Sequence, residues 1–284
     1  MIGHFIEWGI RSWVRLFGRE IKDGEAAWLH GPIGSDQPIG GEIYRQLSES
    51  EGLTMRTNHP GSGLMADFLA LSRPGFDAST VDEAVREFYE RSSHFTLDSW
   101  AEWSGLFRPL GALLVSTVSH RIQQLNLPTS SLATSRGMSN EVIQLLEPDT
   151  GTIRYTGWFR SLKQSGDIIY AGFYSICTPP RAAGPCVKVV FPLPLGSATV
   201  ILRPERDAQG RFQLVSSGVG FGDAGFYRIH ATGTGTRKVR LLRAMKEQIV
   251  VYVDEEGVLR TDHHFRFFRL PILNLHYRIR PNTR

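Results

Sequence analysis

The sequence predicts an α+β protein in which a helical N-terminal half packs on a C-terminal antiparallel β-barrel or strongly curled sheet of about ten strands. Up to about residue 130, apolar residues recur at spacings of three and four, which is the period of amphipathic helices. From Ser139 to Arg280, short β-rich segments alternate with turn sequences, and their connections are too short for the crossover helices of a parallel sheet. We therefore expect a helical region at 1–130 and a barrel-like region at 131–284, forming one compact unit.

The composition and charge exclude several classes of protein. Hydrophobic residues make up 41% of the 284 residues and charged residues 21%, which provides for a sizeable core and excludes disorder by composition. The net charge of +4 is small and the arginines are scattered, so no nucleic-acid partner is expected. No apolar stretch reaches the roughly 18 residues of a membrane span, and no secretory signal is visible. A cytoplasmic protein is the expectation.

The two cysteines, Cys177 and Cys186, flank a proline-rich loop that resembles a hairpin connection. Their side chains could approach across this loop, and an oxidising compartment would allow a disulfide. Without a secretory signal, two half-buried thiols in a cytosolic protein are the preferred interpretation.

The N-terminal half contains several helical patterns. Residues 1–22 carry Trp, Phe and Ile on one face and Arg and Lys on or beside the other. This helix is expected either to dock on the rest of the protein or to lie at a membrane interface. Further helices are expected at 42–51, at 64–72, after the capping-box pattern Thr80-Val-Asp-Glu83, and at 110–125.

The C-terminal half contains the β-rich segments, which are bounded by turn signals such as Asp-Ala-Gln-Gly and Asp-Glu-Glu-Gly. The expected strands are 141–146, 152–162, 167–177, 186–191, 198–203, 211–216, 226–231, 238–253, 258–268 and 272–280. Both faces of 167–177 are apolar, which is typical of a strand that is covered on both sides.

The last two expected strands each have one apolar and one polar face. If they form a hairpin, their polar faces align, because side chains alternate between the faces of a strand. The aligned polar patch contains Asp262, His264, Arg266, Asn274, His276 and Arg278. Either it lines the interior of the barrel, where its arginines and histidines would hold an anionic group and Asp262 with His264 would form an acid–base pair, or it is a solvent-exposed outer face.

Four more side chains are candidates for binding a ligand. Tyr170 and Tyr174 lie on the strand with two apolar faces, where they either line a pocket or serve as packing residues. Arg243 and Glu247 share the parity of core-facing residues in 238–253. Because charged groups among core residues are normally paired, these two either pair with each other or project into a cavity.

A second, weaker candidate site lies in the aromatic segment 95–107. His94, Asp98 and Glu102 are spaced four residues apart and share one face if the segment is helical. No metal site is expected, because the adjacent His263 and His264 point to opposite faces of a strand. No cofactor is expected either, since the glycine-rich segments lack the spacing of a phosphate-binding loop.

Three segments, Tyr89–Gly111, Thr134–Met138 and Leu259–Phe268, resemble a bacterial protein family of the actinomycete type. The resemblance implies a cytoplasmic bacterial protein. It implies no activity and transfers no catalytic residue.

The leading functional hypothesis is a binding protein for a hydrophobic or anionic amphiphilic small molecule, held in the barrel or between the barrel and the helices. Arg266, His264 and Arg278 would hold the polar end of that molecule. One alternative is a metal-independent enzyme that uses acid–base chemistry in an enclosed pocket, through Asp262 and His264 or through Asp98 and His94. Another is a scaffold that attaches to a membrane surface through residues 1–22.

Overall fold

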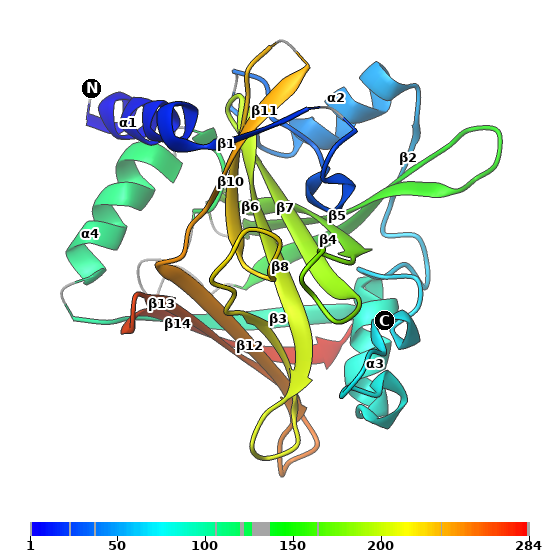
Figure 1. The fold of residues 1–284 in the computed structure, drawn as a ribbon. Helices are drawn as coiled ribbons and strands as arrows, with labels where there is room; N and C mark the ends of the chain where they lie inside the picture. The colour runs from blue at the N-terminus through cyan, green and yellow to red at the C-terminus, as the bar shows by residue number, and fades with distance from the viewer. Residues whose placement is uncertain are drawn as a thin grey trace.

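The computed structural model describes residues 2–22, 24–36, 38–105, 107–119, 122–126, 137–163, 165–233 and 235–282. Within these residues the main element is an antiparallel sheet of fourteen strands, accompanied by four short α-helices (Figure 1). The helices are α1 (Ile2–Phe17), α2 (Glu42–Glu51), α3 (Glu83–Glu90) and α4 (Phe107–Leu114).

The strands follow one another along most of the C-terminal half. They are β1 (Arg19–Lys22), β2 (Thr54–Thr57), β3 (Phe95–Trp103), β4 (Met138–Leu146), β5 (Ile153–Leu162), β6 (Ile168–Cys177), β7 (Cys186–Leu193), β8 (Gly196–Arg206), β9 (Phe212–Ser216), β10 (Phe226–Ala231), β11 (Thr236–Leu241), β12 (Met245–Val253), β13 (Leu259–Phe267) and β14 (Leu270–Pro281). The longest path through the sheet has the order β2-β4-β5-β6-β7-β8-β9-β12-β13-β14-β3.

The sheet divides at β8. One edge of β8 pairs with β7, whereas its other edge pairs with β10 near Val200 and with β9 near Arg203. One branch therefore continues through β10, β11 and β1, and the other through β9, β12, β13, β14 and β3. In Figure 1 the strands β3, β13 and β14 run across the lower part of the view, at a steep angle to β8.

The predicted fold class, a helical half on a C-terminal β-barrel or strongly curled sheet of about ten strands, is wrong in two respects. The N-terminal half supplies strands β1, β2 and β3 to the sheet, and the sheet is open. β3 approaches β4 through its side chains, with Ser99 Oγ 3.3 Å from Met138 Sδ. Across the described residues, however, no backbone pairing joins these two strands. The expected boundary near residue 130 lies outside the described residues.

The segment with the candidate residues Asp98 and Glu102 forms a strand because a neighbouring strand, β14, pairs with it along its whole length. β3 pairs with β14 over its full length, from Phe95 opposite Pro281 to Trp103 opposite Leu273. This cross-strand pairing overrides the helical spacing of the same residues, since strand formation depends strongly on tertiary context.

The other expected helices agree with the structure to different degrees. α2 spans the expected residues, but α1 ends at Phe17, before β1. Segment 64–72 contains only a 3-10 turn, Leu69–Leu71, and the cap of α3 is Asp82, whose carboxylate accepts a hydrogen bond from Ala84 N at 2.8 Å. After α4 the chain forms a π-helical turn, Val115–Ser119.

β6 is covered on both faces, as its sequence indicates. On one side the buried Tyr44 of α2 packs against Phe173, with ring centroids 4.9 Å apart, and its hydroxyl donates to Gly172 O at 3.3 Å. Tyr170 and Tyr174 project from the other face. At the end of β6, Cys177 lies directly opposite Cys186 of β7, and both thiols are free.

We predict that Gly157→Ala lowers the free energy of unfolding by about 1–3 kcal/mol. A Cβ at Gly157 would lie 2.1 Å from Tyr44 Cε1, and the buried ring would have to leave its position between α2 and the sheet. Urea denaturation measures the change. Gly9→Ala is the control, because a Cβ at Gly9 of α1 meets nothing within 4 Å, and it should leave stability unchanged or raise it slightly. Equal stability of Gly157→Ala and wild type would show that Tyr44 is not held against the sheet.

Candidate functional site

An apolar cavity of about 720 Å³ lies between the two walls of the sheet. One wall comes from β5, β6, β7 and β8, and the facing wall from β12, β13, β14 and β3, while α3 and α4 add residues between them. Aromatic and branched side chains make up most of the lining, including Trp158, Tyr170, Tyr174, Phe191, Val200, Leu202, Ile249, Phe265, Leu275 and Tyr277.

The cavity reaches the surface beside α4. Leu113 of α4 and Phe267 at the end of β13 both line the cavity, and both are exposed. Gly111 of α4 lies so close to Trp103 that a Cβ there would be 2.1 Å from the indole ring, so α4 is seated tightly at this end. An apolar molecule would therefore enter between α4 and the end of β13.

The alternation of side chains decides which residues of the closing hairpin reach the cavity. β13 and β14 do pair as an antiparallel hairpin, with Asp262 opposite His276. The apolar faces of the two strands line the cavity, through residues such as Phe265 and Leu275. The polar patch lies on the opposite faces of the same strands and does not line it. It consists of Asp262, His264, Arg266, Asn274, His276 and Arg278.

The polar patch has an internal hydrogen-bond network. His276 Nδ1 is 2.7 Å from Asp262 Oδ1, and His264 Nδ1 is 2.9 Å from Asn274 Oδ1. Asp262 is therefore paired with His276 and not with His264. The structure also brings Glu102, from the second candidate site, to 3.7 Å from His276 Nε2.

The other two members of the second candidate site are separated from this network. Asp98 forms an ion pair with Arg280, on the neighbouring β14. His94 precedes β3, and its Nε2 accepts a hydrogen bond from Gly61 N at 2.9 Å. The spacing of four residues brings the side chains together only in a helix, so the strand disperses them.

Of the four remaining candidates, Tyr170, Tyr174 and Glu247 line the cavity and Arg243 does not. Arg243 is exposed in a turn between β11 and β12, which divides the single strand expected at 238–253. The sequence pattern placed Arg243 on the same face as Glu247 by assuming one continuous strand, and the turn interrupts that alternation of side chains.

Glu247 and His263 form a carboxylate–imidazole pair inside the cavity. Glu247 Oε1 lies 2.6 Å from His263 Nε2, and the backbone N of Glu247 donates to Ser216 Oγ at 3.0 Å. The second carboxylate oxygen, Oε2, is buried and has no hydrogen-bond partner among the residues that the structure describes. The His263 ring also stacks on Phe265, with centroids 4.2 Å apart. The pair thus presents one free acceptor in apolar surroundings.

Arg160 on β5 is a cavity residue that the sequence interpretation missed. It is only 2% exposed, and its guanidinium carbon lies 4.8–5.5 Å from the ring centroids of Tyr277, Trp158 and Tyr170. Its Nη2 contacts Met138 Sδ at 3.4 Å, and no described residue accepts a hydrogen bond from its Nε. The available signal was its position between Trp158 and Leu162 on one face of an expected strand.

The charge of Arg160 is not neutralised by a carboxylate in the part of the chain that the structure describes, where no ion pair includes it. Guanidinium groups stay protonated in proteins, so Arg160 brings a positive charge to the cavity. Burial raises the pKa of Tyr170 to about 12, so its hydroxyl remains protonated and able to donate at neutral pH. The cavity therefore combines apolar walls with one buried cation.

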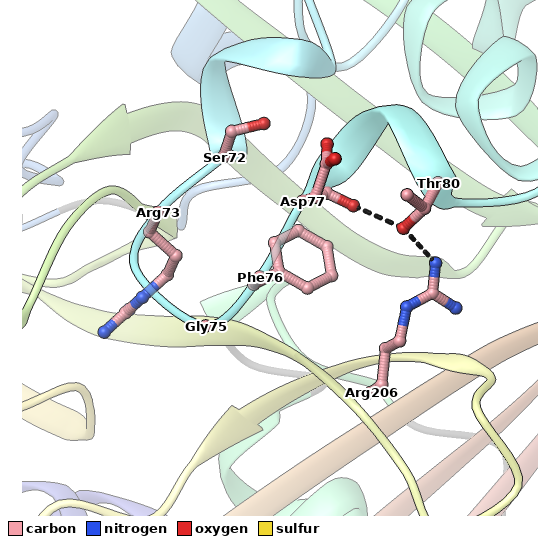
Figure 2. A pocket seen from close by; sticks show the side chains of 7 residues that line it. All are labelled: Ser72, Arg73, Gly75, Phe76, Asp77, Thr80 and Arg206. Atoms are coloured by element: carbon pink, nitrogen blue, oxygen red, sulfur yellow. Dashed lines mark hydrogen bonds between the residues drawn. The ribbon is translucent and has the colours of Figure 1, made fainter.

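A second hollow, open to solvent, lies between the loop before α3 and the end of β8 (Figure 2). Figure 2 shows Thr80 between Asp77 and Arg206. The Thr80 hydroxyl donates to Asp77 O at 2.7 Å and accepts from Arg206 Nη2, and the Asp77 carboxylate accepts from Ser79 N. Because these polar groups satisfy one another, the hollow is a weaker candidate than the cavity.

Among the described residues, no group of three or more His, Cys, Asp or Glu side chains is placed to hold a metal ion. No helix in the same part of the chain combines the length and apolar character that crossing a bilayer demands.

We predict a coupling free energy of about 1.5–3 kcal/mol between Glu247 and His263 in a double-mutant cycle with alanine, read from urea denaturation. Removing either partner leaves the other buried without a hydrogen bond. The Asp262–His276 pair is a matched control of the same chemistry and nearly the same length. Its side chains are 25% and 33% exposed, against 9% and 14% for Glu247 and His263, so its coupling should stay below about 1 kcal/mol. Similar coupling in both pairs would contradict the burial of Glu247 and His263.

Comparison with known proteins gives no relative for this chain. No protein-family model, no curated protein and no solved structure matches it. The lining and charges of the cavity are therefore the basis of the functional proposal that follows.

Proposed function

We propose that this protein binds a hydrophobic or amphiphilic small molecule in the cavity between the two walls of its sheet. The observation that carries the proposal is the cavity itself, about 720 Å³ of space with an almost wholly apolar lining. Protein interiors are close-packed and leave few voids larger than a water molecule. Small-molecule sites, in contrast, are apolar spaces of roughly 300–1,000 Å³ with a few polar groups.

The position of the mouth supports the same proposal. Leu113 and Phe267 present apolar surface where the cavity meets solvent, which suits a ligand with an apolar chain. Asp262 and His264, the acid–base pair of the enzyme hypothesis, face away from the cavity. Binding is therefore the function that we propose, and not acid–base catalysis by these residues.

Binding of the neutral fluorescent probe phenylnaphthylamine tests the proposal. We expect saturable binding to the wild-type protein and about tenfold weaker binding to Val251→Trp, because Val251 lines the cavity and an indole there would occupy its space. Titration of probe fluorescence gives the affinities.

Val219→Trp is the matched control, since Val219 is 66% exposed and does not line the cavity. It should bind the probe like wild type. Circular dichroism and thermal unfolding verify that both variants are folded. Absence of saturable binding to the wild-type protein would overturn the proposed function, and so would equal binding by the two tryptophan variants.

We propose as a second candidate function that α1 attaches the protein to an anionic membrane surface. α1 docks on the protein through Val14, which is fully buried, while Arg240 Nη1 donates to Phe17 O at 2.6 Å. On its outer side Trp8 is 64% exposed and Leu16 is 75% exposed. Arg15 of α1 is exposed, and so are Arg19 and Lys22 in β1, which follows the helix; exposed apolar and basic residues in one segment favour the interface of an anionic bilayer.

We predict that Trp8→Glu combined with Leu16→Glu lowers partitioning onto vesicles of phosphatidylglycerol and phosphatidylcholine about tenfold. The double variant loses two apolar side chains and gains two negative charges, which the anionic lipid repels. Co-sedimentation with vesicles measures the partition coefficient. Val219→Glu replaces a similarly exposed apolar residue outside α1 and should partition like wild type. A wild-type protein that remains in the supernatant would exclude this second function and leave the cavity proposal untouched.

A further inference from the structure

We infer that the ligand of the cavity carries a carboxylate, and that Arg160, with the hydroxyls of Tyr170 and Tyr277, binds it at the deep end. This inference rests on the proposed function and adds the chemical class of the ligand, an anionic amphiphile with an apolar chain. In this inference the headgroup of the ligand is bound by Arg160, inside the cavity, and not by the polar patch outside it.

The first support is the unfilled hydrogen-bonding capacity of Arg160. A guanidinium presents five N–H donors, and the edge formed by Nε and Nη2 can donate two parallel hydrogen bonds to a carboxylate. Among the described residues, Nε is buried without a hydrogen-bond partner, and Nη2 contacts the weakly accepting Met138 Sδ. The hydroxyls of Tyr170 and Tyr277 are the other polar groups that interact with the guanidinium. Within the described part of the chain, the Nε donor of this edge is therefore unused.

The second support is the charge balance of the lining. Glu247, the carboxylate that lines the cavity, is hydrogen-bonded to His263. Among the described residues, the charge of Arg160 is surrounded by the rings of Trp158, Tyr170 and Tyr277, by the two tyrosine hydroxyls and by the Met138 sulfur, and no carboxylate forms an ion pair with it. A carboxylate would neutralise the buried charge, while an uncharged ligand would leave it unpaired and a cationic ligand would be repelled.

The third support is the depth of the site. Leu273 lies near the mouth, because it pairs with Trp103, against which α4 is seated. Tyr277 is four residues farther along β14, which corresponds to about 13 Å at the rise of an antiparallel strand. A ligand with its carboxylate at Arg160 would place its chain along the apolar wall, with its tail toward Leu113 and Phe267.

A comparison of ligands with the same chain tests the headgroup directly. Dodecanoate, dodecanol and dodecylamine are each used to displace phenylnaphthylamine from the wild-type protein at neutral pH. We expect dodecanoate to bind about 10- to 100-fold more tightly than dodecanol, and dodecylamine to bind most weakly. In Arg160→Met, dodecanoate should fall to the affinity of dodecanol, while dodecanol should bind as it does to wild type.

Two further variants test the assignment even if Arg160→Met does not fold. Tyr277→Phe keeps the ring and removes the hydroxyl, and should weaken dodecanoate a few-fold without affecting dodecanol. Arg278→Met is the matched control, because Arg278 follows Tyr277 on β14 but belongs to the opposite face and does not line the cavity. It should retain the full preference for dodecanoate.

The possible results separate the two proposals. If none of the three chains displaces the probe, the proposed function fails together with the headgroup assignment. If dodecanoate and dodecanol bind the wild-type protein equally, the carboxylate inference fails and the proposed function stands. If the preference exists but is retained in Arg160→Met or lost in Arg278→Met, the assignment to Arg160 is overturned.

Discussion

The pairing register of β12, β13, β14 and β3 determines the chemistry of the cavity. Residues directly opposite one another on neighbouring strands project from the same face, so the pairs Glu247–Phe265 and His263–Leu275 enter the cavity together. A slip of one residue would exchange the faces and carry Asp262 and its polar neighbours into the apolar space. The one irregularity in the β13–β14 pairing lies between Phe265 and Arg266, beyond the pairs that line the deeper cavity. The register there is undisturbed, and the cavity stays apolar.

The division of the sheet at β8 keeps the two walls apart. Its first part continues into β10 and its second part into β9, so the wall that contains β12, β13 and β14 leaves the first wall at an angle and does not stack flat against it. On the outer face of the wall formed by β5, β6, β7 and β8, the Tyr44 ring of α2 packs directly against the backbone at Gly157. α2 therefore packs on the outer face of this wall, while the cavity lies on its inner face.

Local sequence patterns predicted the strands of the C-terminal half well, because alternation and turn signals are local properties. The pattern also identified the apolar and polar faces of β13 and β14. It did not reveal β3, whose strand form depends on pairing with β14 about 180 residues later in the chain, as in Ser99 opposite Tyr277. Nor did it show which face of the hairpin is enclosed, since this depends on the position of the opposite wall. Arg160 was missed for the same reason. The sequence shows a single charged residue among apolar ones, but only the structure shows that it is buried without an acidic partner among the described residues.

Arg160 is costly for the protein to bury alone. Removing a guanidinium from water carries a penalty on the order of several kcal/mol, and each of its three aromatic contacts returns roughly 0.5–2 kcal/mol. The rings therefore offset much of the penalty but leave the Nε donor unsatisfied. A residue held only for packing would be replaced at lower cost by methionine or leucine, which fill similar space without charge. The retained charge is most useful when an anion completes its hydrogen bonds, and the apolar path from Arg160 to Leu113 is the shape that a carboxylate with a hydrocarbon chain would fill.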